Sequence, residues 1–228
     1  MKIKFGALVV DGRGKIGGHV ASKNRGGAYL RTKVTPVNPQ TSFQNAVRNR
    51  LTAFAQAWRG LTASQRNAWN NAVSDFAKTD IFGDIKQPSG INLYVKLNAN
   101  LDSVGVSALS LPPLPSEVSP VLTISGSAAA GVPALSVSFT PDPVPADTAF
   151  ILMATAQVSP GKSFLKNEYR ELSVLDAAST SPKNALADYN ARFGSLVAGQ
   201  KIGLGLVPVN KLTGQKGQMI TTSIIVAA

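Results

Sequence analysis

The sequence predicts an α+β protein, with helices in the first half of the chain and mainly strands in the second half. The clearest helical periodicity lies between residues 41 and 101. Six short β-like runs follow it and are separated by turn residues, without alternating βαβ units. Hydrophobic residues make up 44% of the 228 residues, which is enough for a packed core.

The first forty residues are expected to form an extended basic arm. Residues 3–10 have the pattern of a short strand, and residues 28–30 that of a second one. Around them, glycines are interspersed with lysines and arginines, so this segment has few apolar side chains to bury by itself. We therefore expect residues 1–40 to be extended and to become ordered against a partner or against the rest of the chain.

A helix is predicted for about residues 42–59. Thr41 and Gln44 fit a capping box at its start, and Gly60 is placed to end it. Apolar side chains recur along one face at spacings of three or four residues. They are Phe43, Val47, Leu51, Phe54 and Trp58.

A second helix is predicted for about residues 63–77. Thr62 and Gln65 repeat the capping box, and Trp69 and Phe76 belong to a second apolar stripe. The two helices are therefore expected to form a hairpin in which their aromatic side chains face each other.

This hairpin also raises the hypothesis of a DNA-reading helix-turn-helix, because its turn is tight and its sequence is basic. However, the first helix is as basic as the second, and we expect no third helix that would complete a compact core. We therefore favour a structural role. The polar side chains that the second helix could present to base edges are Gln65, Arg66, Asn67, Asn70 and Asn71.

Residues 88–101 fit two structures. Alternating apolar side chains favour a strand, whereas Ser89 as a cap and leucines at positions 93, 97 and 101 favour a helix. We predict a helix, which makes residues 41–107 a helical region. Four prolines in residues 108–120 then indicate a stiff linker and a domain boundary.

The remaining residues, 121–228, are predicted to form an immunoglobulin-like or fibronectin-like β-sandwich, because short strands alternate with turns over about 110 residues. A short helix is expected to begin at Ser181-Pro182 and to end before Gly194. The expected strands are residues 120–125, 134–140, 149–156, 168–175, 201–209 and 218–226.

No catalytic, cofactor-binding or metal-binding residue is predicted. The chain has no cysteine, so metal sites with thiolate ligands are excluded. It has one histidine, His19, which leaves little basis for a catalytic relay that depends on histidine. Asp75, Asp80 and Asp84 lack the spacing of a Ca²⁺-binding loop, and no pair of carboxylates stands out as a general acid and base. We therefore expect no enzymatic activity.

Two glycine motifs are rejected as nucleotide sites. Residues 12–17 match G-x-G-x-x-G, but no acid occurs between Asp11 and Asp75, where the dinucleotide fold requires one. Residues 161–163 end like a phosphate-binding loop, but Ala156 stands where that motif requires its first glycine.

The net charge of +11 lies entirely in the first 100 residues. They contain 15 basic and four acidic residues, whereas residues 101–228 contain eight of each. Such a field attracts a polyanion or an acidic protein surface, although it can also serve solubility alone. Because the charges are dispersed and the segment is glycine-rich, docking on an acidic protein surface is favoured over contact with nucleic acid.

No segment approaches the roughly 20 apolar residues of a membrane span. The apolar run after Lys4 is short, and Asp11 and Arg13 follow it directly without a cleavage site. We expect a soluble protein that has no membrane contact and no export signal of the usual kind.

The order of these segments resembles a group of uncharacterised proteins that are encoded by tailed phages and prophages and are regarded as virion components. Three stretches carry the resemblance: GRGKIGGHVASKNRGGAYLRTKVTPVNPQT, NRLTAFAQAWRGLTASQRNAWNNA and PSGINLYVKLN. The similarity covers the first 100 residues best, and the C-terminal region matches only in type. It implies a structural protein of a phage particle and no site residues.

We therefore expect a virion protein, with a minor capsid or capsid-decoration subunit as the favoured role. Its basic N-terminal region would dock on an acidic capsid or connector surface, and homo-oligomers are compatible with this role. A tail or head–tail connector component is a variant, and a nucleic-acid-binding protein using residues 1–100 is the alternative. The expected docking residues are Arg13, Lys15, Lys23, Arg25, Arg31, Lys33, Arg48 and Arg50.

Overall fold

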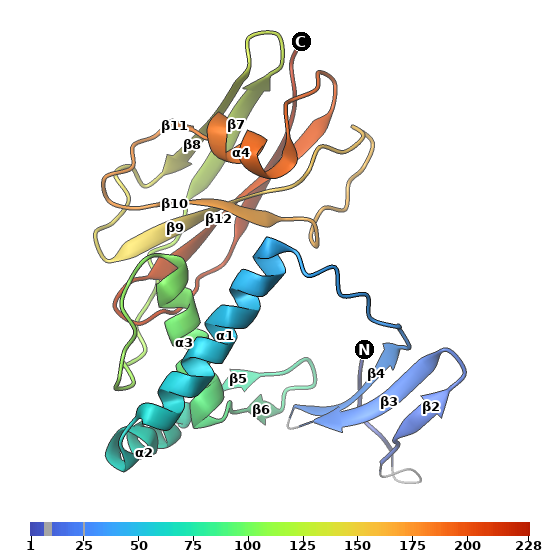
Figure 1. Cartoon of the computed structure of the whole chain (residues 1–228), viewed down its shortest axis with the longest axis vertical. Coiled ribbons are helices and arrows are strands. Elements are labelled where there is room, and N and C mark those ends of the chain that lie inside the picture. Colours follow the sequence, from blue (N-terminus) through green and yellow to red (C-terminus); the bar gives the residue numbers. More distant parts are fainter. Residues whose placement is uncertain (7–10, 25) are drawn as a thin grey trace. The chain divides into compact units, whose positions relative to one another are not determined.

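The computed structural model describes residues 1–6, 11–24 and 26–228, and it confirms the α+β class (Figure 1). The chain divides into two compact units. The first comprises Met1–Asn49 and Ala77–Gln87, and the second comprises Arg50–Phe76 and Pro88–Ala228. This division differs from the four segments expected, because residues 108–120 lie inside the second unit. No helix in the described part of the chain is long and apolar enough to cross a membrane.

The first unit contains a four-stranded antiparallel sheet in the order β1-β4-β3-β2. This sheet corrects the expectation of an extended arm over residues 1–40. Gly17, with a φ of 55°, and Gly18 form the two-residue turn between β2 and β3, so these glycines close a hairpin. The strands are β1 (Lys2–Ile3), β2 (Gly14–Ile16), β3 (His19–Asn24) and β4 (Gly27–Thr32).

The two strands predicted within this segment have different outcomes. The strand expected at residues 28–30 is confirmed as part of β4. The strand expected at residues 3–10 overlaps β1 only at Ile3: residues 4–6 are not in a strand, and residues 7–10 lie outside the described residues.

A short hairpin of β5 (Lys78–Thr79) and β6 (Ile85–Lys86) completes the first unit. Asp80 accepts hydrogen bonds at Oδ1 from the backbone N–H groups of Phe82 and Asp84, and its Oδ2 lies 3.5 Å from Lys2 Nζ. The Phe82 hydrogen bond is the largest cause that lowers the pKa of Asp80. Asp80 and Asp84 therefore belong to the loop between two short strands.

Both predicted helices of the hairpin are present, but the second ends at Asn71 and not near residue 77 as predicted. Helix α1 (Ser42–Gly60) has residues in both units, and α2 (Ala63–Asn71) is followed by the 3₁₀ turn η1 (Ala72–Ser74). The capping box at Thr62 is complete. Its hydroxyl accepts from the backbone N–H of Gln65, and the Gln65 side chain accepts from the backbone N–H of Thr62.

A third helix, α3 (Gly90–Ser103), confirms the helix predicted after Ser89 and corrects the expectation that no third helix completes this region. Tyr94 of α3 lies at the centre of an aromatic cluster. Its ring centroid is 5.3 Å from that of Trp69, 5.5 Å from Trp58 and 6.4 Å from Phe54. The aromatic side chains of α1 and α2 therefore meet around a residue of α3.

The apolar stripe of α1 is only partly covered. Phe54 and Trp58 pack in the aromatic cluster, whereas Phe43, Val47 and Leu51 are 55%, 64% and 56% exposed. Helix α2 has nine residues and α1 has nineteen, so α2 cannot cover the whole length of α1. The apolar periodicity of α1 therefore predicts a helix, but it does not predict how much of the apolar stripe is buried.

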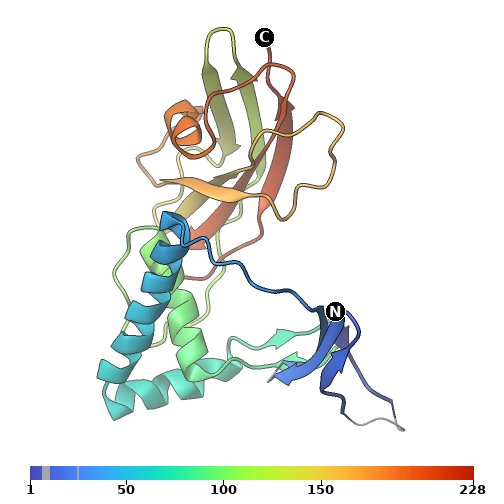
Figure 2. The same cartoon turned by 45° about the vertical axis from the view of Figure 1, so that its right-hand side comes forward.

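Beyond the linker, all six predicted strands are present, together with the short β11 (Lys183–Asn184), in two antiparallel sheets. One sheet has the order β11-β8-β7 and the other β10-β9-β12-β13, and Figure 2 shows them from a second direction. The six strands are β7 (Thr123–Ala129), β8 (Ala134–Thr140), β9 (Thr148–Ala154), β10 (Arg170–Leu175), β12 (Lys201–Asn210) and β13 (Ile220–Ile225).

Side chains from both sheets form one hydrophobic core, which also receives Tyr189 of α4 (Leu186–Phe193). The helix ends at Phe193, before Gly194 as predicted, but it begins at Leu186, five residues after the predicted start at Ser181. Tyr189 is fully buried and donates a hydrogen bond from its hydroxyl to the carbonyl oxygen of Thr155, at 3.0 Å. Burial raises the pKa of Tyr189 to about 12.

Candidate functional site

The register of the β1–β4 sheet places its basic side chains together. Directly paired residues of an antiparallel sheet point to the same face, and Val20 pairs with Lys15 on one side and with Arg31 on the other. Tyr29 pairs with Lys2 and with Ser22, two positions along the same face. We call this surface the basic face. Its residues are Lys2, Lys15, Val20, Ser22, Tyr29 and Arg31.

The opposite surface, the apolar face, carries most of the hydrophobic side chains of the sheet. Its cation is Lys23, and Lys23 Nζ lies 3.7 Å from Asp11 Oδ2. Positive charge without a carboxylate partner is therefore concentrated on the basic face. The hydrophobic residues of the apolar face are Ile3, Ile16, Ala21, Ala28 and Leu30.

The first unit has almost no core. Among its described residues, Ala21 is the one buried hydrophobic side chain, whereas Ile16, Val34 and Val37 are 72%, 67% and 87% exposed. Within this unit, the β5–β6 hairpin contacts the N-terminal strand region through ion pairs of Asp80 with Lys2 and of Asp84 with Lys4. Stable folds generally bury a sheet face against another layer, whereas the hydrophobic side chains of this sheet other than Ala21 are half-buried or exposed.

Basic residues of the first unit outnumber the carboxylates that could pair with them inside the unit. The unit contains eleven lysines and arginines against three aspartates, a net charge of +8. Each aspartate is already paired within the unit: Asp11 with Arg13 and Lys23, Asp80 with Lys2, and Asp84 with Lys4 and Lys86. Among the described residues, no carboxylate lies within ion-pair distance of Lys15 or Arg31, and both side chains are exposed.

The structure groups some of the predicted docking residues and separates others. Lys15 and Arg31 share the basic face, Lys33 directly follows β4, Arg13 precedes β2, and Lys23 lies on the apolar face.

The other predicted docking residues lie elsewhere. Arg48 donates from Nη2 to Asn38 Oδ1 at 2.8 Å, and Arg25 lies outside the described residues. Arg50 is in the second unit, where it pairs with Asp102 of α3. The sequence alone did not identify Lys2 and Tyr29 as residues of the basic face, because the strand register determines which side chains share a face.

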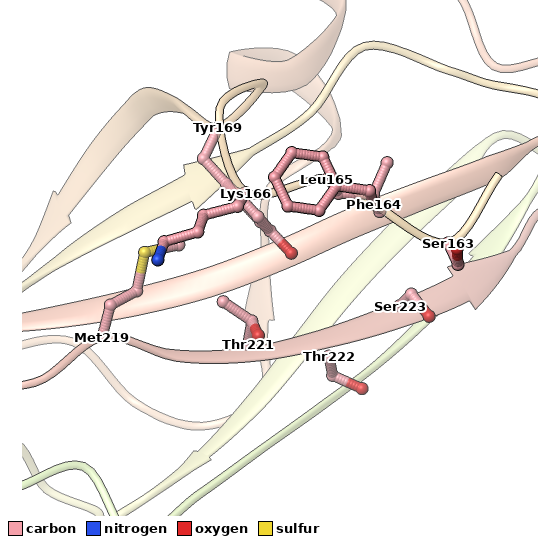
Figure 3. Close-up of a pocket in the computed structure, with 9 residues that line it drawn as sticks. All are labelled: Ser163, Phe164, Leu165, Lys166, Tyr169, Met219, Thr221, Thr222 and Ser223. Carbon is pink, nitrogen blue, oxygen red and sulfur yellow. The ribbon is translucent and has the colours of Figure 1, made fainter. Parts of the chain in front are cut away.

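The second unit has a pocket of about 520 Å³ between the β9–β10 connection and β13 (Figure 3). The connection contributes Ser163, Phe164, Lys166 and Tyr169, and β13 contributes Thr221 and Ser223. In the view of Figure 3, Lys166 extends toward Met219 at one end of the pocket, and Ser163 and Ser223 lie at the other end. Hydroxyl groups, an aromatic ring and a cation thus line one cavity.

Two glycines of β12 make room for the walls of this pocket. A Cβ on Gly203 would lie 2.9 Å from Tyr169 Oη, and one on Gly205 would lie 2.3 Å from Met219 Cε. Larger residues would therefore displace the side chains that lie across the sheet here. Burial raises the pKa of Tyr169, so this phenol is neutral at physiological pH.

The connection that carries Phe164 and Lys166 is anchored along its length. Lys201 donates from Nζ to the carbonyl oxygen of Lys162 at 3.1 Å, Lys162 pairs with Glu168, and Leu165 is 7% exposed. The pocket wall is therefore held in place by contacts of its own.

In the part of the chain that the structure describes, no three His, Asp or Glu residues are grouped as metal ligands. Comparison of the sequence and fold with family models, curated proteins and solved structures found no match.

Proposed function

We propose that this chain is a structural virion protein, a minor capsid or capsid-decoration subunit whose first unit docks on an acidic protein surface of the particle. One observation carries the proposal: a unit with a net charge of +8 has a single buried hydrophobic side chain among its described residues. Such a unit gains its stability from a partner, as the arms of assembly proteins do. The resemblance noted for the first 100 residues is in line with the same role.

An acidic protein surface fits the basic face better than nucleic acid does. Sheets that bind single-stranded nucleic acid generally present exposed aromatic rings on which bases stack. Tyr29 is the one aromatic residue of the basic face, and it is partly buried between paired strands. Lys15 and Arg31 are exposed on a regular sheet, which is suited to pairing with carboxylates at fixed positions.

The β-rich part of the second unit is assigned to a fibronectin-like sandwich. Seven antiparallel strands in two sheets around one core support this assignment. The fourth strand, β10, pairs with β9, whereas in constant-type immunoglobulin domains the fourth strand belongs to the sheet of the first two. Such sandwiches serve as spacing and binding modules, so this part would project from the docked unit.

Purification of particles from the phage or prophage that encodes the chain tests this function. Mass spectrometry of gradient-purified particles is expected to detect the chain at a constant ratio to the major capsid protein. A chain that occurs in infected cells and is missing from particles would overturn the proposal. Retention of the purified chain on DNA, lost steeply as salt increases, would favour the nucleic-acid alternative.

A further inference from the structure

The pocket of the second unit contains an aromatic side chain that packing does not explain. Phe164 is 64% exposed, although its neighbour Leu165 is buried and the connection is anchored on both sides. An exposed ring at the edge of a cavity offers an apolar surface to a ligand. The volume of about 520 Å³ is within the range of small-molecule sites.

The lining also contains hydroxyl groups, beside the apolar side chains of Leu165 and Met219. Ser163, Thr221 and Ser223 present hydroxyl groups, each of which can donate and accept a hydrogen bond. A saccharide presents the complementary surface, with hydroxyls around its rim and C–H groups on the faces of its ring. The exposed Phe164 ring can pack on such a C–H face while the hydroxyls of β13 bind the rim.

Lys166 adds a positive charge to this lining. The acid next to it in the connection, Glu168, pairs with Lys162, and among the described residues no carboxylate lies within ion-pair distance of Lys166. A single lysine matches a single negative charge, which a carboxylate carries at neutral pH, whereas a phosphate monoester carries nearly two.

We propose that this pocket binds an acidic saccharide that carries a carboxylate on a sugar ring. The carboxylate pairs with Lys166, a ring face packs on Phe164, and ring hydroxyls bind Thr221 and Ser223. This site is independent of the docking of the first unit, and the purified full chain can be tested without a particle.

Isothermal titration of the full chain with a galacturonic acid trimer and with a galactose trimer tests the site, because the two probes differ mainly in their carboxylates. The acidic trimer is expected to bind at least about tenfold more tightly. Phe164→Ala is expected to weaken it at least about tenfold, and Lys166→Gln to remove the preference for the acidic probe. Both side chains are exposed, so the variants should fold, which thermal melting verifies.

Matched controls are Phe82→Ala, which removes an exposed ring from the first unit, and Lys183→Gln, which removes a lysine from β11. Both are expected to leave binding unchanged. Binding of neither trimer, equal binding of both, or equal losses in the control variants would overturn the proposal. Tighter binding of a thymidine hexanucleotide that also depends on Phe164 would overturn it in favour of a nucleotide site.

Discussion

Lys15 and Arg31 lie on one face of the N-terminal sheet, at matching positions on two strands that are separated by Val20 of β3. With neighbouring strands about 4.8 Å apart, their Cα atoms are roughly 10 Å apart. Two like charges at this separation repel each other, and the described residues place no carboxylate beside them. In the proposed docking, an acidic surface over this face would relieve the repulsion.

Reversing these two charges tests the basic face. We expect the double variant Lys15→Glu and Arg31→Glu to lose at least about tenfold in affinity for particles, because each favourable pair becomes a repulsive one. Binding of purified chain to particles that lack it, measured by co-sedimentation at low and physiological salt, is the measurement.

Two control variants accompany this experiment. Exchanging the two residues, as Lys15→Arg with Arg31→Lys, keeps the charge and should keep most of the binding. Arg59→Glu with Arg66→Glu makes the same change in net charge at exposed helical positions of the second unit and should have little effect. An equal loss in both charge-reversed variants would mean that net charge, and not the basic face, determines docking.

Gly214 ties α3 to the connection between β12 and β13. Its φ is 72°, its carbonyl oxygen accepts a hydrogen bond from Asn100 Nδ2 at 2.8 Å, and a Cβ would lie 2.4 Å from the carbonyl oxygen of Leu97. Gly214→Ala is expected to lower the free energy of unfolding by more than about 3 kcal/mol, because strain and a backbone clash combine.

Gly199 provides the matched control for this variant. Its φ is 77°, but a Cβ there meets open space, so Gly199→Ala should cost about 1 kcal/mol from strain alone. Urea unfolding of both variants measures the difference. Equal losses of unfolding free energy in the two variants would contradict a close contact between α3 and this connection.

Asn98 fixes the start of the proline-rich linker to α3. This fully buried residue accepts from the backbone N–H of Leu109 at 2.6 Å and donates to the Leu109 carbonyl oxygen at 3.2 Å. Asn98→Ala is expected to destabilise the second unit by about 1–3 kcal/mol, since it leaves both backbone groups without a partner. Faster amide exchange at Leu109 would accompany the loss, and unchanged exchange there would contradict this role.

Ionisation of Tyr189 is expected to lower the stability of the second unit at high pH. Its pKa is raised from the ordinary value of 10.0 to about 12, so its contribution to stability is complete below pH 10. The unfolded state ionises first, and the contribution of about 2–3 kcal/mol is lost as the pH rises from 10 to 12. Thermal unfolding between pH 8 and 12 measures this loss.

Burial also raises the pKa values of Tyr94 and Tyr169, so the wild-type profile contains contributions from all three residues. Tyr189→Phe isolates one of them. The variant should be less stable by about 1 kcal/mol at pH 8, where its hydrogen bond is lost, but should lose less stability than wild type between pH 10 and 12. An identical pH profile in both proteins would contradict the assignment.

Local signals in the sequence predicted the elements of the second unit well. The capping box of Thr62 and Gln65, the Ser89 cap and the period-two strands all depend on neighbouring residues, and all of them are confirmed. The N-terminal sheet was missed because its short strands have few apolar side chains and its glycines are equally typical of an unstructured arm.

Contacts between distant residues explain the rest of what the sequence could not predict. Tyr94 joins three helices because of packing that no local pattern records. Phe164 of the β9–β10 connection and Thr221 of β13 line the same pocket although they are far apart in the sequence, and the grouping of Lys15 with Arg31 depends on register. Neither site has a sequence motif, because each combines residues from strands and loops that are separate in the sequence.

Cross-linking inside intact particles tests the docking of the basic face most directly. A zero-length carbodiimide reagent joins lysine amines to carboxylates in contact, and mass spectrometry identifies the joined peptides. We predict links from Lys15 or Lys33 to aspartates or glutamates of another virion protein. Particles that contain the chain but yield such links only from lysines of the second unit would contradict docking through the N-terminal sheet.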